Sequence, residues 1–73
     1  MVMPLGLLAD GEAAEIVGLG GAAAAGTRAE DMGLRVGKSI RVLANAGGPV
    51  LVKVDETRIA VARGLAMKIT VRR

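Results

Sequence analysis

The sequence predicts a small all-β barrel of about five short strands, with one short helix between the first two strands and a 3₁₀ turn before the last. Three observations lead to this prediction. The chain has 73 residues, so we expect one domain, residues 1–73, with a thin core. Apolar and polar residues alternate regularly after Gly37, as in strands with one buried face. Glycines or charged pairs interrupt the alternation at short intervals, as turns do.

The beginning of the chain is expected to form one helical turn and one strand. Residues 4–8 open with a proline, which suits a first helical position, and carry two leucines three residues apart that would share a face. An Asp-Gly turn follows at residues 10–11. Residues 12–17 favour a strand, and the glycines within residues 18–21 predict a bulge or a flexible loop.

A short helix is expected over residues 28–32. Thr27 and Glu30 have the spacing of a capping box, in which each side chain accepts a hydrogen bond from the other residue's backbone, so the helix would begin at Thr27. The alanines of residues 22–25 also have high helix propensity. A longer helix beginning at Ala22 is therefore the alternative.

The glycines of residues 33–39 match a phosphate-binding loop with one spacer residue missing. A true loop of this kind wraps phosphate with consecutive backbone N–H groups and leads into a helix, whereas the residues after Gly37 alternate as a strand does. Gly33 suits the left-handed position that ends a helix, and Leu34 could then pack back on that helix. We therefore interpret this segment as a helix stop followed by a strand entry.

Strands are expected to dominate the rest of the chain. A tight turn at residues 55–56 and a 3₁₀ turn at residues 63–67 separate some of them. The expected strands are residues 38–44, 50–54, 58–62 and 68–72. The residues expected to face inward, including those of the first strand, are Ala14, Ile16, Ile40, Val42, Val50, Val52, Val54, Ile59, Val61, Ile69 and Val71.

The composition makes catalysis and tight metal binding improbable. The chain has no His and no Cys, which removes the commonest general base and the preferred ligands of transition metals. The adjacent carboxylates of residues 30–31 and 55–56 are explained as a helix cap and a solvated turn. Residues 18–23 match a dinucleotide fingerprint, but no acid follows at the required distance. We expect no catalytic residue, no cofactor and no metal site.

The charge is divided unevenly along the chain. Residues 1–37 carry two arginines and five acids, whereas residues 38–73 carry eight basic residues and two acids, for a net charge of +3. The basic half allows an acidic partner or a place near a membrane, although solvated outward positions explain it more simply. Residues 1–8 are too short for a secretory signal, and no apolar run reaches the roughly 20 residues that span a bilayer. We therefore expect a cytoplasmic protein that is not inserted in the membrane.

The order of short motifs along the chain resembles the FeoA family, small proteins of bacterial ferrous iron uptake. Together these motifs cover nearly the whole chain, and their order and spacing are jointly specific. They are residues 5–11 (LGLLADG), Ile16 with the glycines after it, residues 32–37 (MGLRVG), residues 47–50 (GGPV) and residues 59–69 (IAVARGLAMKI).

The resemblance implies an SH3-like barrel that docks on the cytoplasmic part of the membrane GTPase transporter FeoB and regulates it without catalysis of its own. It also implies recruitment to the inner face of the membrane through that partner. Two positions depart from the family pattern. Ala29 replaces a larger apolar residue three positions before the methionine, and residues 55–56 replace a turn that usually contains glycine.

Outward and loop positions supply the candidate partner contacts. These candidates are Leu43, Leu51, Arg63, Leu65 and Met67. Ordinary packing under the loops explains these side chains equally well. Recognition of proline-rich peptides is not expected, because it uses a groove lined with aromatic rings and the chain has no Phe, Tyr or Trp.

Other functions stay open at this point. A small basic barrel could bind nucleic acid, but single-strand binders stack bases on aromatic rings, so we expect no nucleic-acid partner. The same barrel forms the C-terminal domain of iron-dependent repressors that resemble the diphtheria toxin repressor, and the chain could be a free-standing relative of that domain. The sequence also leaves open a weak homodimer and direct contact with iron.

Overall fold

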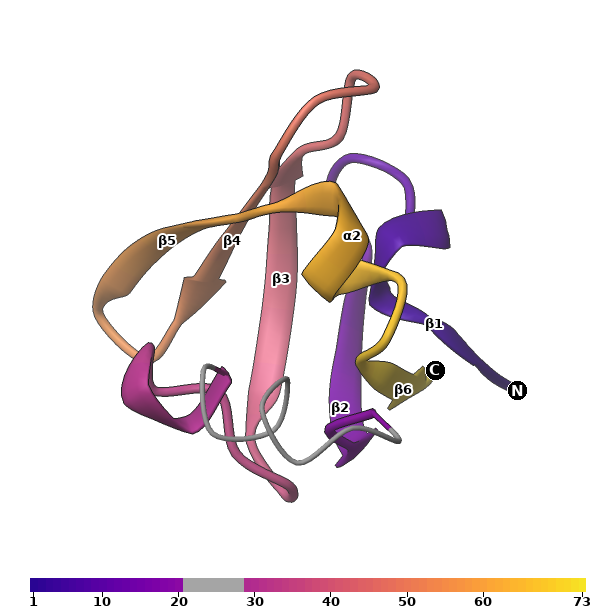
Figure 1. The fold of residues 1–73 in the computed structure, drawn as a ribbon, viewed down its shortest axis with the longest axis vertical. Coiled ribbons are helices and arrows are strands. Elements are labelled where there is room, and N and C mark those ends of the chain that lie inside the picture. Colours follow the sequence, from indigo (N-terminus) through magenta and orange to yellow (C-terminus); the bar gives the residue numbers. More distant parts are fainter. Residues whose placement is uncertain (21–28) are drawn as a thin grey trace.

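A computed structural model describes residues 1–20 and 29–73, and these residues form one six-stranded antiparallel sheet (Figure 1). The sheet order is β1-β6-β2-β3-β4-β5. The strands are β1 (Val2–Pro4), β2 (Ala13–Gly18), β3 (Ser39–Ala44), β4 (Val50–Val54), β5 (Thr57–Val61) and β6 (Thr70–Arg72). The expected all-β, SH3-like barrel is confirmed.

Two short helices lie where the sheet curls round on itself. The 3₁₀ helix η1 (Leu5–Leu7) follows the edge strand β1, and the helix α2 (Arg63–Ala66) follows the other edge strand, β5. The two helices contact each other, as the indigo and orange coils of Figure 1 show. Short helices rather than strand pairing therefore connect the two edges.

Strand β1 is the element that sequence reasoning missed, so the structure has six strands where about five were expected. It pairs with β6 through three residues, from Val2 opposite Arg72 to Pro4 opposite Thr70. A three-residue edge strand has too few positions to show alternation. Its pairing partner, β6, lies at the other end of the sequence. The helical turn expected next is confirmed as η1, with Leu5 and Leu8 both fully buried.

The helix stop at Gly33 is confirmed in detail. Residues 29–31 are helical, and the expected beginning of this helix, at Thr27 or Ala22, lies outside the described residues. Gly33 has a φ of 92°, its N–H donates to the Glu30 carbonyl at 2.9 Å, and the Leu34 N–H donates to the Ala29 carbonyl at 2.9 Å. This pair of hydrogen bonds is a Schellman motif, which satisfies the last carbonyls of the helix. Strand β3 then begins at Ser39, so the segment is no phosphate loop.

The expected interruptions of the strands are confirmed as bulges and turns. The pairing of β2 with β6 shifts between Ile16 and Gly18, where the sequence turns glycine-rich. A second shift, between Val42 and Ala44 in the pairing of β3 with β4, was not anticipated. Residues 55–56 form the tight turn between β4 and β5. Residues 21–23 of the dinucleotide match lie outside the described residues.

The segment before the last strand is an α-helix, not the expected 3₁₀ turn. The Ala66 N–H donates to the Ala62 carbonyl at 2.9 Å and the Met67 N–H to the Arg63 carbonyl at 3.0 Å, which are bonds between residues four apart. Only the exit tightens, because the Lys68 N–H donates to the Leu65 carbonyl, three residues back. The strand after it is shorter than expected and begins at Thr70.

The core is aliphatic and contains no buried polar side chain among the described residues. Every residue expected to face inward is buried except Ile59, which is half-buried and packs against the core from the edge strand β5. The fully buried large side chains are Leu5, Leu8, Ile16, Leu34, Ile40, Ile69, Val42, Val50, Val52, Val61 and Val71. Alternation along β2, β3 and β4 was therefore a reliable guide to the core.

Candidate partner-binding surface

Arg63 ties the beginning of α2 to two loops. Its Nε donates to the carbonyl oxygens of Gly47 and Gly48, both at 3.0 Å, and its Nη1 donates to the Gly6 carbonyl at 3.3 Å. Its Nη2 donates to Oδ1 of Asn45. A planar guanidinium presents several donors in fixed directions, which suits it to gather carbonyls from separate segments. Arg63 was expected to contact a partner, and in the structure each of its three side-chain nitrogens donates within the chain.

Asn45 completes this network and was missed by sequence reasoning. Its Nδ2 donates to the carbonyls of Gly6 at 3.0 Å and Leu8 at 2.6 Å, and its backbone N–H donates to Oδ1 of Asp10 at 2.6 Å. The residue lies just after β3, where the sequence shows only an ordinary polar loop. No local signal distinguishes an asparagine that satisfies distant backbone carbonyls from one that faces solvent.

The network holds two exposed apolar side chains at one corner of the barrel. Leu7 on η1 is 59% exposed and Met67 at the end of α2 is 42% exposed. The two helices meet closely at Gly6, where an added Cβ would lie 2.6 Å from Sδ of Met67. We call Leu7 and Met67 the apolar corner. The expectation of an outward Met67 is confirmed, whereas sequence reasoning did not single out Leu7.

Leu65 was expected at an outward or loop position, and this was wrong. It is only 8% exposed and belongs to the core. The expected 3₁₀ turn gave no basis for a buried face, whereas the α-helix places Leu65 and Ala66 toward the barrel and leaves Met67 outside. Leu65 therefore anchors α2 in the core and is not a surface contact.

The remaining candidates, Leu43 and Leu51, lie on the outer face of the sheet. Leu51 on β4 stands opposite Ala44 of β3 and Ala60 of β5, and Leu43 occupies the bulge in β3. Both side chains are half-buried. The structure thus divides the five candidates between two places, the region of α2 and the outer face of β3 and β4.

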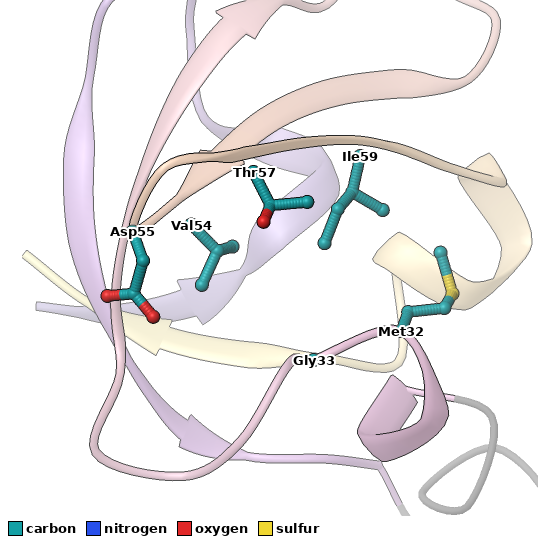
Figure 2. A pocket seen from close by; sticks show the side chains of 6 residues that line it. All are labelled: Met32, Gly33, Val54, Asp55, Thr57 and Ile59. Carbon is teal, nitrogen blue, oxygen red and sulfur yellow. The ribbon is translucent and has the colours of Figure 1, made fainter.

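A shallow pocket of about 80 Å³ lies between the helix stop and the β4–β5 turn (Figure 2). Sites for small ligands usually enclose roughly 300 to 1,000 Å³, so this pocket is too small for a cofactor. Among the described residues that line it, Asp55 alone is charged, and its Oδ2 accepts a hydrogen bond from Lys38 Nζ at 2.8 Å. The sequence did not indicate a pocket here, and the lining residues are Met32, Gly33, Val54, Asp55, Thr57 and Ile59.

Three of the seven acidic residues, all of which lie in the described segments, take part in surface ion pairs. Arg72 pairs with Glu15 at 2.9 Å, and Arg73 pairs with Glu12. The pKa of Glu12 is lowered from its ordinary value of 4.5, first by the backbone N–H of Ala9, which donates to it at 2.7 Å, and then by Arg73. Within residues 1–20 and 29–73, no three potential metal ligands come together.

Comparison with known proteins places the chain in a family. The FeoA domain model matches residues 3–73. The chain belongs to the FeoA family. It is 35% identical over 68 residues to a protein of Methanocaldococcus jannaschii named as an Fe(2+) transport protein A, covering 93% of this chain and 83% of that one. The FeoA resemblance of the short motifs is therefore confirmed.

Solved structures agree with the FeoA assignment. A crystal structure of an iron uptake regulatory protein, FeoA, superposes with a TM-score of 0.90 at 35% identity, covering 99% of this chain and 96% of that one. A manganese-dependent transcriptional repressor superposes with a TM-score of 0.87 at 22% identity, covering 97% of this chain but 41% of the repressor. This second likeness shows that a repressor contains the same fold as the FeoA family. No helix in the described part of this FeoA-family chain is long and apolar enough to cross a membrane.

Proposed function

We propose that this FeoA-family protein is a small non-enzymatic accessory protein of ferrous iron uptake, which docks on the cytoplasmic part of the membrane GTPase transporter FeoB and regulates it. The family and the name of the Methanocaldococcus relative support the link to Fe²⁺ transport. In this proposal the protein is cytoplasmic and reaches the inner face of the membrane through its partner. Its role is to bind, and the GTPase chemistry belongs to the transporter.

The apolar corner is the observation that carries the proposal. Leu7 and Met67 are large apolar side chains that remain exposed although the chain has a thin core in which to bury them. About half of each side chain is already covered, so its burial against a partner is worth about half of the roughly 1.5 to 3 kcal/mol gained by a fully exposed one. Because Arg63 and Asn45 fix η1 and α2 in place, little conformational freedom remains to be lost on binding. A rigid apolar corner on a small barrel suits docking better than catalysis.

The other candidate contacts take different parts in this proposal. Leu65 and Arg63 act indirectly, the first by anchoring α2 in the core and the second by positioning α2. Leu43 and Leu51 are half-buried on the outer face of the sheet, apart from the apolar corner, and take no direct part in this contact. Met67 is thus the expected candidate that would touch the partner most directly, together with the newly found Leu7.

Calorimetric titration of the transporter's cytoplasmic GTPase domain with the full chain tests this proposal. The variants Leu7→Ser and Met67→Ser should each weaken binding by roughly tenfold, the effect of losing more than 1 kcal/mol at the centre of an interface. Val36→Ser is the matched control. Val36 is an equally exposed apolar residue, and it lies in the loop between Gly33 and β3 rather than in η1 or α2. It should bind like the unaltered protein.

The same samples show whether docking has a regulatory effect. The rate of GTP hydrolysis by the transporter domain should change when the unaltered chain is added and should not change with Met67→Ser. Absence of binding by the unaltered chain would contradict the proposal. Equal losses in Val36→Ser and Met67→Ser would contradict the choice of the apolar corner.

A further inference from the structure

Three basic residues stand directly opposite one another across the outer face of the sheet. Arg41 on β3 pairs with Lys53 on β4, and Lys53 pairs in turn with Arg58 on β5. These strands lie side by side in Figure 1. Neighbouring strands are about 4.8 Å apart, so the three residues form a straight line across the sheet, which we call the cationic row.

The cationic row receives little compensation from the chain itself. Arg41 Nη1 donates to the carbonyl of Gly11 at 2.7 Å, which satisfies a donor without neutralising the charge. In the segments that the structure describes, neither Lys53 nor Arg58 takes part in an ion pair, whereas Lys38, Arg72 and Arg73 do. Like charges directly opposite one another on a sheet are destabilising. The row therefore costs stability that an anionic partner would restore.

An apolar row runs beside the cationic row on the same face. It consists of Ala44, Leu51 and Ala60, which stand opposite one another on β3, β4 and β5. Two residues along a strand span about 6.6 Å, so this row begins within one side-chain length of the cations. The outer face is thus amphipathic, with a line of charges and a parallel line of apolar groups.

We propose that this outer face binds an acidic, amphipathic segment of a partner protein. Its carboxylates would lie on the cationic row, and its apolar side chains would lie on Leu51 and the flanking alanines. The inference goes beyond the proposed function, because it names a second surface, away from the apolar corner, and the chemistry of the segment that occupies it. It does not depend on which protein carries that segment.

The surroundings of the row favour an acidic protein segment over nucleic acid. The chain has no aromatic residue on which bases could stack. Leu51 offers a phosphate backbone nothing to bind, but it suits a leucine or valine of a peptide.

A designed peptide tests the match of pattern as well as charge. The peptide is a helix with glutamates and leucines on one face, and its control has the same composition with these residues scrambled. Titrated into isotopically labelled full-length chain at about 0.15 M salt, where long-range attraction is screened, the patterned peptide should bind several-fold more tightly. The amide signals of Arg41, Lys53, Arg58 and Leu51 should shift.

Variants that remove single charges show whether the peptide binds the cationic row or is attracted by the basic charge of the whole chain. Lys53→Gln and Arg58→Gln should each weaken binding of the patterned peptide by roughly 2- to 5-fold, the range of single exposed ion pairs. Lys68→Gln, which removes an exposed charge elsewhere, should have no such effect. Lys53→Gln should also raise the melting temperature of the free chain, because it relieves the repulsion within the row.

Several results would overturn the inference. Equal affinity for the patterned and scrambled peptides would show attraction by charge alone, and tighter binding of duplex DNA of equal charge would assign the face to nucleic acid. Self-association of the free chain that disappears in Lys53→Gln would assign the face to a second copy. Because this test contains no part of the transporter, failure of the proposed docking on FeoB leaves its outcome unaffected.

Discussion

Arg63 and Asn45 form one hydrogen-bonded unit, in which the guanidinium donates to Oδ1 of Asn45 and both side chains donate to the carbonyl of Gly6. The two residues are eighteen positions apart in the sequence, yet together they join the β3–β4 loop, η1 and α2. Met67 follows α2 directly and Leu7 lies in η1. The unit therefore determines where the apolar corner lies.

Removal of the arginine should loosen the whole unit. Arg63→Ala should destabilise the fold by about 1 to 3 kcal/mol, since it removes the hydrogen bonds to the carbonyls of Gly6, Gly47 and Gly48 and to Oδ1 of Asn45. Arg63→Lys keeps the charge but loses the planar fork, so its loss should be intermediate. Urea unfolding followed by circular dichroism measures the free energy of unfolding. Arg35→Ala, an exposed arginine next to the helix stop, is the control and should change it little.

The coupling between Arg63 and Asn45 can be measured separately. In a double-mutant cycle of Arg63→Ala and Asn45→Ala, the two losses should overlap by about 0.5 to 3 kcal/mol, as is usual for partners in one network. Strictly additive losses would mean that the two side chains stabilise their loops independently.

Two glycine-to-alanine substitutions should change the stability of the protein in opposite directions. Gly33→Ala forces an alanine into the left-handed position of the Schellman motif and should destabilise the protein by about 1 to 2 kcal/mol. Gly64→Ala adds a methyl group inside α2, where no atom outside the adjoining helix backbone lies within 4 Å of it, and should stabilise the protein by about 0.5 to 1 kcal/mol. Thermal unfolding of both variants measures the effects, and a shift of the same sign in both would refute the assignment of these positions.

Substitution of the neighbouring residues Leu7 and Leu8 should have very different effects on stability. Leu8 is fully buried, so Leu8→Ala should cost about 2 to 5 kcal/mol of stability through lost burial and a cavity. Leu7→Ala should cost less than about 0.5 kcal/mol, because the side chain is mostly in solvent. Denaturant unfolding of the two variants distinguishes them. A large loss from Leu7→Ala would mean that Leu7 belongs to the core and is not a docking residue.

Glu12 should make the fold sensitive to acid. Its pKa is lower in the folded protein than its ordinary value, because the Ala9 N–H and Arg73 stabilise the charged carboxylate. The stability it contributes is therefore present above the ordinary value of 4.5 and is lost as the pH falls through the lowered pKa. The melting temperature of the unaltered protein should fall more steeply below about pH 5 than that of Glu12→Gln. Glu56→Gln, which removes a carboxylate in an exposed turn, is the control. Its melting temperature should fall as steeply with acid as that of the unaltered protein.

Sequence reasoning succeeded where the structure depends on neighbouring residues. Gly33 ends a helix because its own backbone conformation is left-handed, and the valines of β4 face inward because side chains alternate along any strand. It failed where a partner from elsewhere in the chain decides the outcome. Strand β1 exists because β6 lies beside it, and Asn45 matters because the carbonyls of Gly6 and Leu8 lie within reach.

The candidate surface shows the same division. That Met67 is exposed followed from the sequence, but Leu65 was misplaced because one α-helical turn in place of a 3₁₀ turn changes which residue faces the core. Leu7 lies in the same short turn as two core leucines, so its motif does not show that one leucine remains outside. Only the contact of η1 with α2 decides this.

The class of fold, the aliphatic core, the helix stop and the family follow from the sequence, because these depend on periodicity, composition and the order of short motifs. The six-stranded order, the Arg63–Asn45 unit, the apolar corner and the cationic row become visible only in the three-dimensional structure. Each of these depends on residues far apart in the chain. Sheet register and loop closure bring such residues together, and local preferences carry no information about either.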